Sequence, residues 1–232
     1  MKIVNCKLSI GGFQKFSFID YPDKISAVIF TQGCNFACGY CHNPELVPKQ
    51  NNTQISFDEI LSFLKTRVGK LEAVTITGGE PLLQKSIFSV CRAIKELGFL
   101  VKVDTNGAFP QRLKTLIDNQ LVDYVAMDIK TSFKNYKSVV RAHLDLTLIE
   151  QSIDILLNSR IAYEFRTTLV KGLIKPEDIQ WIMRRIKTAD VYYLQQFQRS
   201  KHLNREFLKA KPFEKKQIDK LLKLNIVKTI CR

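Results

Sequence analysis

Three cysteines lie close together near the start of this 232-residue chain. Cys34, Cys38 and Cys41 stand in one segment, with three residues between the first two and two residues between the last two. Thiolates are soft ligands that suit zinc and iron. Three thiolates from one loop can hold three irons of a [4Fe–4S] cluster, which normally has four cysteine ligands. The spacing therefore favours a cluster with one open iron, able to bind a substrate as well as to carry electrons.

Zinc is the alternative metal for this segment, with His42 as a fourth ligand. Structural zinc sites usually combine two ligand clusters from separate parts of a chain, and no second cluster follows here. Adjacent Cys41 and His42 would also have difficulty in binding one ion. The remaining cysteines, Cys6, Cys91 and Cys231, are isolated. Six cysteines in a chain of this length favour metal or redox chemistry over a disulfide framework.

Short apolar runs alternate with segments of helical periodicity, which predicts strands and helices in alternation. The predicted strands are Ser26–Thr31, Ala73–Thr77, Leu100–Asp104, Tyr124–Ile129, Tyr163–Leu169 and Val191–Gln196. The predicted helices are Ser56–Thr66, Lys85–Leu97, Pro110–Asn119, Thr147–Asn158, Pro176–Lys187 and Glu214–Leu224, with a short one at Tyr136–Arg141. Two of them begin with a predicted capping box, Ser56 with Glu59 and Thr147 with Glu150.

This alternation predicts an α/β fold with a parallel sheet, which is either flat and doubly wound or curved into part of a barrel. In both cases ligands bind at the C-terminal ends of the strands. The chemically suggestive residues lie late in the predicted strands or just after them. The three cysteines and Gly78-Gly79-Glu80 follow strands, Asp104, Asp128 with Lys130 and Gln195-Gln196 lie at strand ends, and Arg166 lies late in its strand. We therefore expect them to lie along one edge of the sheet.

The cysteine spacing, with an aromatic residue before the third cysteine, resembles that of the radical S-adenosylmethionine (SAM) superfamily. The flanking segments Gly11–Pro22 and Cys41–Leu46 resemble the glycyl-radical-enzyme activases. Within these, the chain is most similar to the anaerobic ribonucleoside-triphosphate reductase activating proteins of the longer type. The resemblance covers most of the chain and is densest from about Gly11 to Lys130. It implies a partial (β/α)6 barrel, similar to a TIM barrel, with outer helices and the active site at the C-terminal edge.

The resemblance also implies an oxidoreductase reaction. The open iron of the superfamily's cluster chelates the amino and carboxylate groups of SAM, and one electron from the cluster cleaves SAM to methionine and a 5′-deoxyadenosyl radical. In an activase this radical removes a hydrogen atom from a backbone glycine of a partner enzyme. The partners implied are thus a glycyl-radical enzyme and a one-electron donor such as flavodoxin or ferredoxin.

Residue by residue, the resemblance makes Cys34, Cys38 and Cys41 the iron ligands. Tyr40 would pack near the adenine of SAM. The segment Gly78-Gly79-Glu80 would contact the methionyl amino group, because the glycines let a ligand approach the backbone and a glutamate accepts hydrogen bonds from an ammonium.

Four further residues match positions near SAM in activases. Lys130 would neutralise the SAM carboxylate and is counted with the cysteines as catalytic. Asp104 and Asp128 would either bind a monovalent cation or anchor Lys130. Arg166 would contact SAM through its planar guanidinium, and we expect no ion pair between Arg166 and Glu164. Gln196 is a weaker candidate for an adenosine contact.

Two other functions fit part of the pattern. A radical SAM enzyme that acts on a small molecule, such as 7-carboxy-7-deazaguanine synthase, has a comparable Gly-Gly-Glu-Pro motif. Its cluster loop normally continues into Asp-Thr, where this chain has His42-Asn43-Pro44. An iron–sulfur electron carrier or a zinc-stabilised binding module needs neither Glu80 nor Lys130 at the same sheet edge.

Composition limits the remaining possibilities. The formal net charge is +14, but the basic residues are spread along the chain without a nucleic-acid motif, so nucleic-acid binding is not expected. No apolar run approaches the roughly 18 residues of a membrane span, and the N-terminal residues lack the features of a signal peptide. We expect a cytoplasmic protein with one radical SAM domain, residues 1–232: a preamble at 1–25, a βα core at 26–200 and a C-terminal helix and tail at 201–232.

Overall fold

The computed structural model describes residues 7–49, 55–199, 207 and 209–231. The chain divides into two compact units, each built from segments that are separate in sequence. The first unit comprises Met1–Asn35, Leu46–Thr105 and Gln111–Val125, and the second comprises Phe36–Glu45, Asn106–Pro110 and Ala126–Arg232. The single-domain organisation and its internal boundaries stay a prediction, and Cys6 lies outside the described residues.

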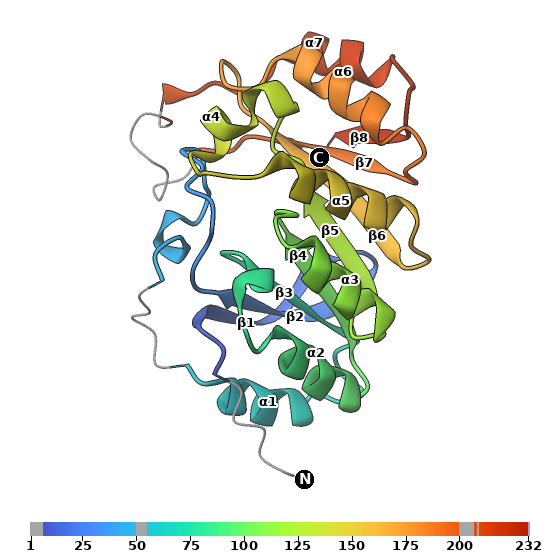
Figure 1. Ribbon diagram of the computed structural model, residues 1–232. Coiled ribbons are helices and arrows are strands. Elements are labelled where there is room, and N and C mark those ends of the chain that lie inside the picture. Colours follow the sequence, from blue (N-terminus) through green and yellow to red (C-terminus); the bar gives the residue numbers. More distant parts are fainter. Residues whose placement is uncertain (1–6, 50–54, 200–206, 208, 232) are drawn as a thin grey trace. The chain divides into compact units, whose positions relative to one another are not determined.

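The first unit contains strands β1 (Ile10–Tyr21), β2 (Lys24–Thr31), β3 (Ala73–Gly78) and β4 (Leu100–Thr105), which are neighbours in chain order. β1 pairs with β2 in the antiparallel sense, whereas β2 with β3 and β3 with β4 are parallel. Helices α1 (Phe57–Lys65) and α2 (Ile87–Glu96) lie beside each other in this unit (Figure 1). Short 3-10 turns η1 (Pro44–Leu46) and η2 (Pro81–Leu83) follow β2 and β3.

The second unit contains strands β6 (Ala162–Leu169), β7 (Tyr192–Gln196) and β8 (Thr229–Cys231), which pair in parallel in chain order. Its helices are α4 (Tyr136–Val140), preceded by the turn η3 (Phe133–Asn135), α5 (Leu146–Leu157), α6 (Pro176–Arg185) and α7 (Lys215–Leu222). Helices α6 and α7 lie side by side (Figure 1). Helix α3 (Pro110–Asp118) and strand β5 (Tyr124–Asp128) each contain residues of both units.

Every predicted strand is present, with its ends shifted by at most two residues, and so is every predicted helix. The expected α/β class with parallel strands is therefore confirmed. β1 and β8 were not predicted. β1 occupies much of the supposed preamble, and many of its side chains, including Phe16, Phe18 and Ile19, are exposed. The register of β1 against β2 shifts at several points, so its residues lack the regular alternation by which strands are recognised.

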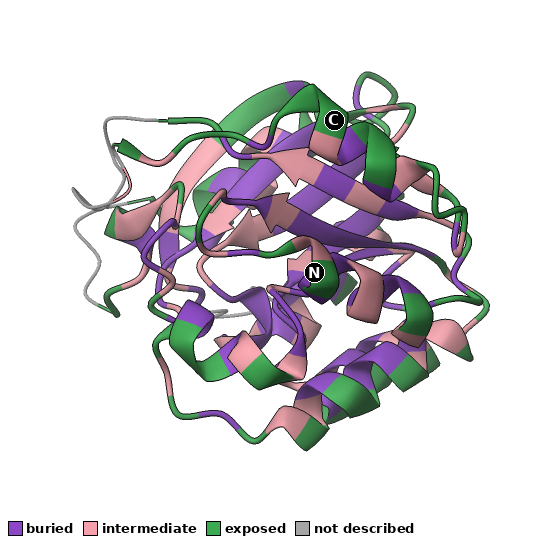
Figure 2. Cartoon of the chain, turned by 90° about the horizontal axis from the view of Figure 1, so that it is seen from above, coloured by how far each residue is buried: buried purple, intermediate pink, exposed green. Residues whose placement is uncertain are grey.

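The core is made of the apolar runs that define the strands and the inner faces of the helices. Figure 2 shows buried residues along the strands, and helices that are buried on one side and exposed on the other. Val74, Ile76, Val101 and Val103 have no exposed surface, as the apolar pattern of parallel strands predicts. Within the described part of the chain, no helix has both the length and the apolar character needed to cross a membrane.

One of the two predicted capping boxes is confirmed. At α1, Ser56 Oγ accepts from the Glu59 N–H at 3.2 Å, and Glu59 Oε2 accepts from the Ser56 N–H at 2.7 Å. The box predicted at Thr147 is wrong. The N-cap of α5 is Asp145, whose carboxylate accepts from the Thr147 N–H at 3.0 Å. α5 begins one residue before Thr147 because Asp145 supplies the stabilising acceptor.

Candidate active site

The first unit holds Cys34 at the start of the cysteine loop, directly after β2. Gly33 has a φ of +95° and donates its N–H to the Leu46 carbonyl at 2.8 Å. The Cys34 N–H donates to the Val47 carbonyl at 3.0 Å. These bonds hold the start of the loop against the segment that follows it in the chain, so the backbone position of Cys34 is fixed without a metal.

The glycines after β3 allow the backbone of that same loop to come close. A Cβ at Gly78, which has a φ of +105°, would lie 2.6 Å from the Thr31 nitrogen. A Cβ at Gly79 would lie 2.2 Å from the Gly33 oxygen. The Gly79 N–H donates to the Thr31 carbonyl at 2.8 Å, and the Glu80 N–H donates to the Gly33 carbonyl at 2.9 Å. The close approach of the Thr31 and Gly33 backbone therefore explains why both residues are glycines. From the sequence, we had expected the glycines to make room for a ligand.

Glu80 is 1% exposed and lies at the start of η2. Its Oε1 accepts from the Thr105 hydroxyl at 2.8 Å and from the Leu82 N–H at 3.0 Å. The carboxylate is thus held in one orientation by β4 and by the turn after β3. Such a buried, oriented carboxylate is suited to a cationic partner such as an ammonium group.

Asp104 is the second-last residue of β4 and pairs with a cation that was not among the predicted site residues. Its Oδ1 lies 2.5 Å from Nζ of Lys102, and its Oδ2 accepts from the Thr77 hydroxyl at 3.2 Å. The Lys102 side chain is only 3% exposed. The signal for Lys102 was available, because it is a single charge in the otherwise apolar run Leu100–Val103, two residues before an aspartate.

The second unit holds the rest of the cysteine loop. The Ala37 N–H donates to the Val140 carbonyl at 2.9 Å, and the Cys41 N–H donates to the Cys38 carbonyl at 3.0 Å. The Phe36 ring packs edge-on against Tyr136, with 6.5 Å between ring centroids. α4 therefore anchors this part of the loop. The turn from Cys38 to Cys41 brings the backbones of these two cysteines close together.

Burial raises the pKa of both thiols in this turn. For Cys38 the charge of Lys130 opposes this effect, and for Cys41 the backbone of Asn43 and the charge of Lys130 do so. Burial also lowers the pKa of His42, with Lys130 adding to the shift. The thiols are accordingly protonated at neutral pH until a metal replaces the protons. No cysteine among the described residues is in a disulfide.

Asp128, Lys130 and Arg166 form an ion cluster in the second unit, between the end of β5 and the middle of β6. Lys130 Nζ lies 2.9 Å from Asp128 Oδ2, and Arg166 Nε lies 2.7 Å from Asp128 Oδ1. Of the two alternatives for Asp128, anchoring Lys130 is therefore what the structure shows. The end of β5 is also tied to β6, since the Ile129 N–H donates to the Arg166 carbonyl at 2.9 Å.

The charges in this cluster stabilise one another. Burial alone would raise the pKa of the Asp128 carboxyl, but Arg166 and Lys130 hold it far below its usual range. Burial alone would lower the pKa of Lys130, but Asp128, with smaller contributions from Tyr40 and Cys38, raises it well above its usual value. Lys130 thus remains an ammonium with three donors, of which Asp128 accepts one.

The expectation that Arg166 would not pair with Glu164 is wrong. Arg166 Nη1 lies 3.8 Å from Glu164 Oε1, and Glu164 is 1% exposed. Residues two apart on a strand point to the same face, so the two side chains are neighbours in β6. Arg166 is therefore positioned by two carboxylates.

Several buried polar atoms in the second unit have no hydrogen-bond partner among the described residues. They are the Tyr40 hydroxyl, Thr131 Oγ1 and Gln196 Oε1. Burying a polar atom without a partner is unfavourable. Tyr40 lies next to Cys41 in the sequence, Thr131 follows β5, and Gln196 is the last residue of β7. Their unpartnered polar atoms suit a polar ligand such as a nucleoside. Together with the thiols of the cysteine loop and the Lys130 ammonium, they fit a [4Fe–4S] cluster and SAM.

The structure thus brings the candidate residues together in two groups. Cys34, Gly78, Gly79, Glu80 and Asp104 lie at the strand ends of the first unit. Cys38, Tyr40, Cys41, Asp128, Lys130 and Arg166 belong to the second unit. Among the residues that the structure describes, no three His, Cys, Asp or Glu side chains converge as ligands of a single metal ion.

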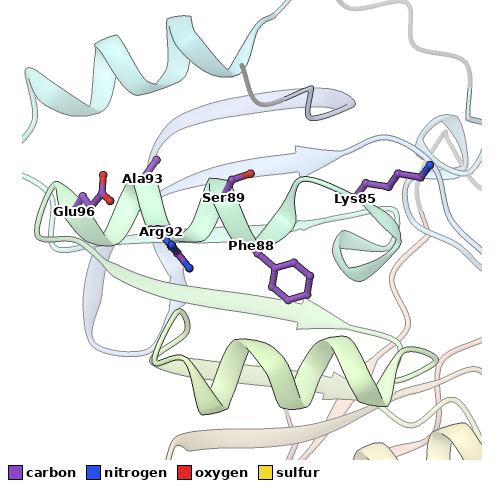
Figure 3. Close-up of a pocket in the computed structure, with 6 residues that line it drawn as sticks. All are labelled: Lys85, Phe88, Ser89, Arg92, Ala93 and Glu96. Atoms are coloured by element: carbon purple, nitrogen blue, oxygen red, sulfur yellow. The ribbon is translucent and has the colours of Figure 1, made fainter. Parts of the chain in front are cut away.

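A separate surface pocket of about 420 Å³ lies along α2. Figure 3 shows the side chains that line it: Lys85, Phe88, Ser89, Arg92, Ala93 and Glu96. The Arg112 guanidinium lies over the Phe88 ring, 5.1 Å from its centroid. None of the candidate residues lines this pocket, and all of its lining residues come from one helix and the residues just before it. We therefore do not assign the chemistry to it.

Comparison with known proteins agrees with the donor set. Residues 28–189 match the family model of the radical SAM superfamily. A relative from Methanocaldococcus jannaschii, described as a glycyl-radical enzyme activating enzyme, is 37% identical over 97% of this chain and 96% of its own length. The pyruvate formate-lyase-activating enzyme of Clostridium pasteurianum is 29% identical over 52% of each chain.

Solved structures show the same fold at low sequence identity. SuiB from Streptococcus suis, bound to SAM, superposes with a TM-score of 0.66 at 14% identity, over 88% of this chain and 49% of SuiB. QueE from Escherichia coli gives a TM-score of 0.58 at 13% identity, over 97% of this chain and 93% of QueE. These likenesses concern the fold alone.

A [4Fe–4S] cluster and SAM are the cofactors of this superfamily, and the thiols of the cysteine loop, the buried ammonium and the fold agree with them. The match covers most of the chain, and the M. jannaschii relative is similar from end to end. The chain therefore belongs to the radical SAM superfamily and, within it, to the glycyl-radical-enzyme activating enzymes.

Proposed function

We propose that this activating enzyme generates the glycyl radical of an anaerobic ribonucleoside-triphosphate reductase. The match to a glycyl-radical enzyme activating enzyme along almost the whole chain supports the activase reaction, and the choice of the reductase as its target rests on the sequence resemblance. The flanking segments Gly11–Pro22 and Cys41–Leu46, which resemble the reductase activases, support the same target.

In this proposal Cys34, Cys38 and Cys41 hold the cluster, and Tyr40 packs near the adenine of SAM. When bound, the cluster and SAM together supply a carbon radical that takes a hydrogen atom from glycine Cα. The protein binds and orients the reactants and excludes water. Burial of Tyr40, which is 3% exposed, supports a closed environment beside the cysteines.

The charged residues bind the two ends of the methionyl group. Glu80, fixed through Oε1, accepts from the ammonium, and Lys130 donates to the carboxylate with the Nζ hydrogens that Asp128 does not accept. Asp128 and Glu164 position Arg166, which contacts an anionic or polar group of SAM in this proposal. In the same proposal Asp104, through its contacts with Thr77 and Lys102, orders the part of the site that lies at β4.

The first experiment measures SAM cleavage and radical transfer together. The protein is reconstituted with iron and sulfide without oxygen, reduced with dithionite and mixed with SAM and purified candidate partners. We expect 5′-deoxyadenosine and an electron paramagnetic resonance doublet on the ribonucleotide reductase. A doublet only on pyruvate formate-lyase would overturn the proposed target. 5′-Deoxyadenosine without a radical on any partner would favour a small-molecule substrate.

Two cysteine variants test the ligand assignment. Cys38→Ala should abolish SAM cleavage and remove most of the cluster absorbance. Cys91→Ala should retain both, because Cys91 is fully buried in α2 and burial raises its pKa to about 12, far from a thiolate ligand. Loss of the cluster in Cys91→Ala would reopen the assignment.

A flavodoxin or ferredoxin is the proposed electron donor in the cell. The net charge of +14 supports association with an acidic protein. Replacing dithionite by a reduced flavodoxin or ferredoxin should sustain SAM cleavage, and failure with both would point to another donor.

A further inference from the structure

Lys102 is a cation inside an otherwise apolar strand. Its neighbours in β4, Val101 and Val103, are fully buried, and its own side chain is only 3% exposed. The ammonium lies 2.5 Å from Asp104 Oδ1 and 5.9 Å from the centroid of the Tyr124 ring. A buried charge is strongly disfavoured unless it is paired. Lys102 is therefore present in β4 together with its partner, Asp104.

The geometry of the strand makes this pair a fixed one. Lys102 and Asp104 are two residues apart, so their side chains leave the same face of β4. The second oxygen of Asp104 accepts from the Thr77 hydroxyl on the adjacent strand β3 at 3.2 Å. Both oxygens of the carboxylate are consequently engaged by the protein in its folded state.

A bound Na⁺ or K⁺ would compete for these same oxygens. Hard cations are held by carboxylate, carbonyl and water oxygens. At Asp104 the positive charge is already supplied at hydrogen-bonding distance by Lys102. The other aspartate that the sequence analysis considered for a cation is also engaged: in the second unit, Asp128 accepts from Arg166 at one oxygen and from Lys130 at the other.

We propose that Lys102 is a built-in cation that takes the place of a monovalent ion at Asp104, so that this protein binds SAM without free Na⁺ or K⁺. Lys102 acts through Asp104 and is a positioning residue. The inference rests on the proposed role of the site in binding SAM. It departs from the monovalent-cation site that the sequence analysis considered for Asp104 and Asp128.

The first test uses the cluster-loaded wild-type protein. SAM affinity is measured by equilibrium dialysis in potassium, sodium and choline chloride at equal ionic strength. We expect the three dissociation constants to agree within about twofold, because no ion has to bind for Asp104 to be neutralised. A loss of affinity of about tenfold in choline would overturn the inference. Absence of SAM binding in all three salts would instead contradict the proposed function.

The second test removes the built-in cation. In choline chloride, Lys102→Ala should bind SAM about tenfold more weakly, since the carboxylate loses its buried partner. Adding K⁺, Na⁺ or methylammonium should restore the affinity, which a purely structural loss would not allow. Lys102→Arg should bind SAM without these ions. Lys114→Ala, which breaks an exposed pair with Asp118, is the control.

Failure of rescue in a folded Lys102→Ala protein would contradict the inference. If this variant does not fold, the wild-type salt series and Lys102→Arg still decide. Thermal unfolding of the wild-type protein in the same three salts gives a readout that does not involve SAM. Equal midpoints support the built-in cation, and a midpoint higher in K⁺ or Na⁺ than in choline contradicts it.

Discussion

Asp128 is the residue where the site depends most directly on charge. Its carboxylate accepts hydrogen bonds from Arg166 and Lys130, and these two cations hold its pKa far below the usual range. A carboxyl group with a lowered pKa in the folded state stabilises the protein above its ordinary pKa, about 3.9. That contribution is lost as the pH falls below this value towards the folded-state pKa.

We predict that Asp128→Asn lowers the free energy of unfolding at pH 7 by about 2 kcal/mol, between the values for exposed and fully buried pairs. The side chain is 26% exposed, which excludes the largest values. Urea unfolding at pH 7 and about pH 3.5 measures the effect, and the variant should lose less stability in acid than the wild-type protein. Asp118→Asn, at an exposed pair, should change stability by less than about 0.5 kcal/mol. Equal acid sensitivity in Asp128→Asn and wild-type protein would contradict this account.

Gly79 is the residue where the backbone packing of the site is tightest. A Cβ would lie 2.2 Å from the Gly33 oxygen and 3.0 Å from the Leu46 oxygen, both of them main-chain atoms. Main-chain atoms that are held by hydrogen bonds cannot move aside as a flexible side chain can.

We predict that Gly79→Ala lowers the Tm by about 5–10 °C, since overpacking costs about 1–3 kcal/mol. Thermal unfolding followed by circular dichroism measures it. Gly12→Ala is the matched control, because the nearest atom to its Cβ is a side-chain atom of Phe30 at 3.6 Å, an ordinary contact. A Gly79→Ala protein as stable as Gly12→Ala would show that the loop adjusts freely.

At the scale of elements, the ends of helices decide where the connecting loops begin. α5 is capped by Asp145, whose carboxylate accepts from the Thr147 N–H, although Thr147 followed by Glu150 matches the sequence pattern of a capping box. The pattern is degenerate, because an Asp two residues earlier can serve as the N-cap in place of Thr147 and starts the helix earlier.

We predict that Asp145→Ala destabilises the protein by about 1 kcal/mol, and Thr147→Ala by much less, because only the first removes an N-cap acceptor. Ser56→Ala at α1, where the box is confirmed, should resemble Asp145→Ala. Urea unfolding of the three variants measures the differences. The reverse order for Asp145 and Thr147 would restore the predicted box.

At the scale of the whole molecule, the dominant property is a net charge of +14. A field of this size raises the rate of encounter with acidic proteins and is screened by salt. SAM binding by residues that are largely buried is screened far less.

We predict that radical formation on an acidic partner slows severalfold when NaCl is raised from low concentration to about 0.3 M, because encounter is electrostatically assisted. SAM cleavage without a partner should change little over the same range. The two rates are measured by paramagnetic resonance of the partner and by 5′-deoxyadenosine released. If both rates fall together, the effect of salt lies in the catalytic step and not in docking.

The sequence by itself determined the parts of this protein that depend on local chemistry. The type and spacing of Cys34, Cys38 and Cys41 predict a cluster, and the buried apolar runs predicted strands that pair in parallel from β2 to β4 and from β6 to β7. Parallel strands place their ends at one edge within each unit, so it was predictable that Glu80 and Lys130 would follow strands and that Asp104 and Arg166 would lie late in strands. The order of apolar and polar residues carries this information, because side chains repeat on one face every 3.6 residues in a helix and every two residues in a strand.

Only the tertiary structure decided which groups pair. In the folded protein Asp104 forms an ion pair with Lys102, and Asp128 forms ion pairs with both Lys130 and Arg166. It also showed that Gly79 makes room for the backbone of Gly33. Residues such as Gly33 and Gly79 are distant in the chain, and their contact depends on how neighbouring strands align. A charge pair forms where folding removes both partners from water, and burial is a property of the packed chain that a local pattern does not contain.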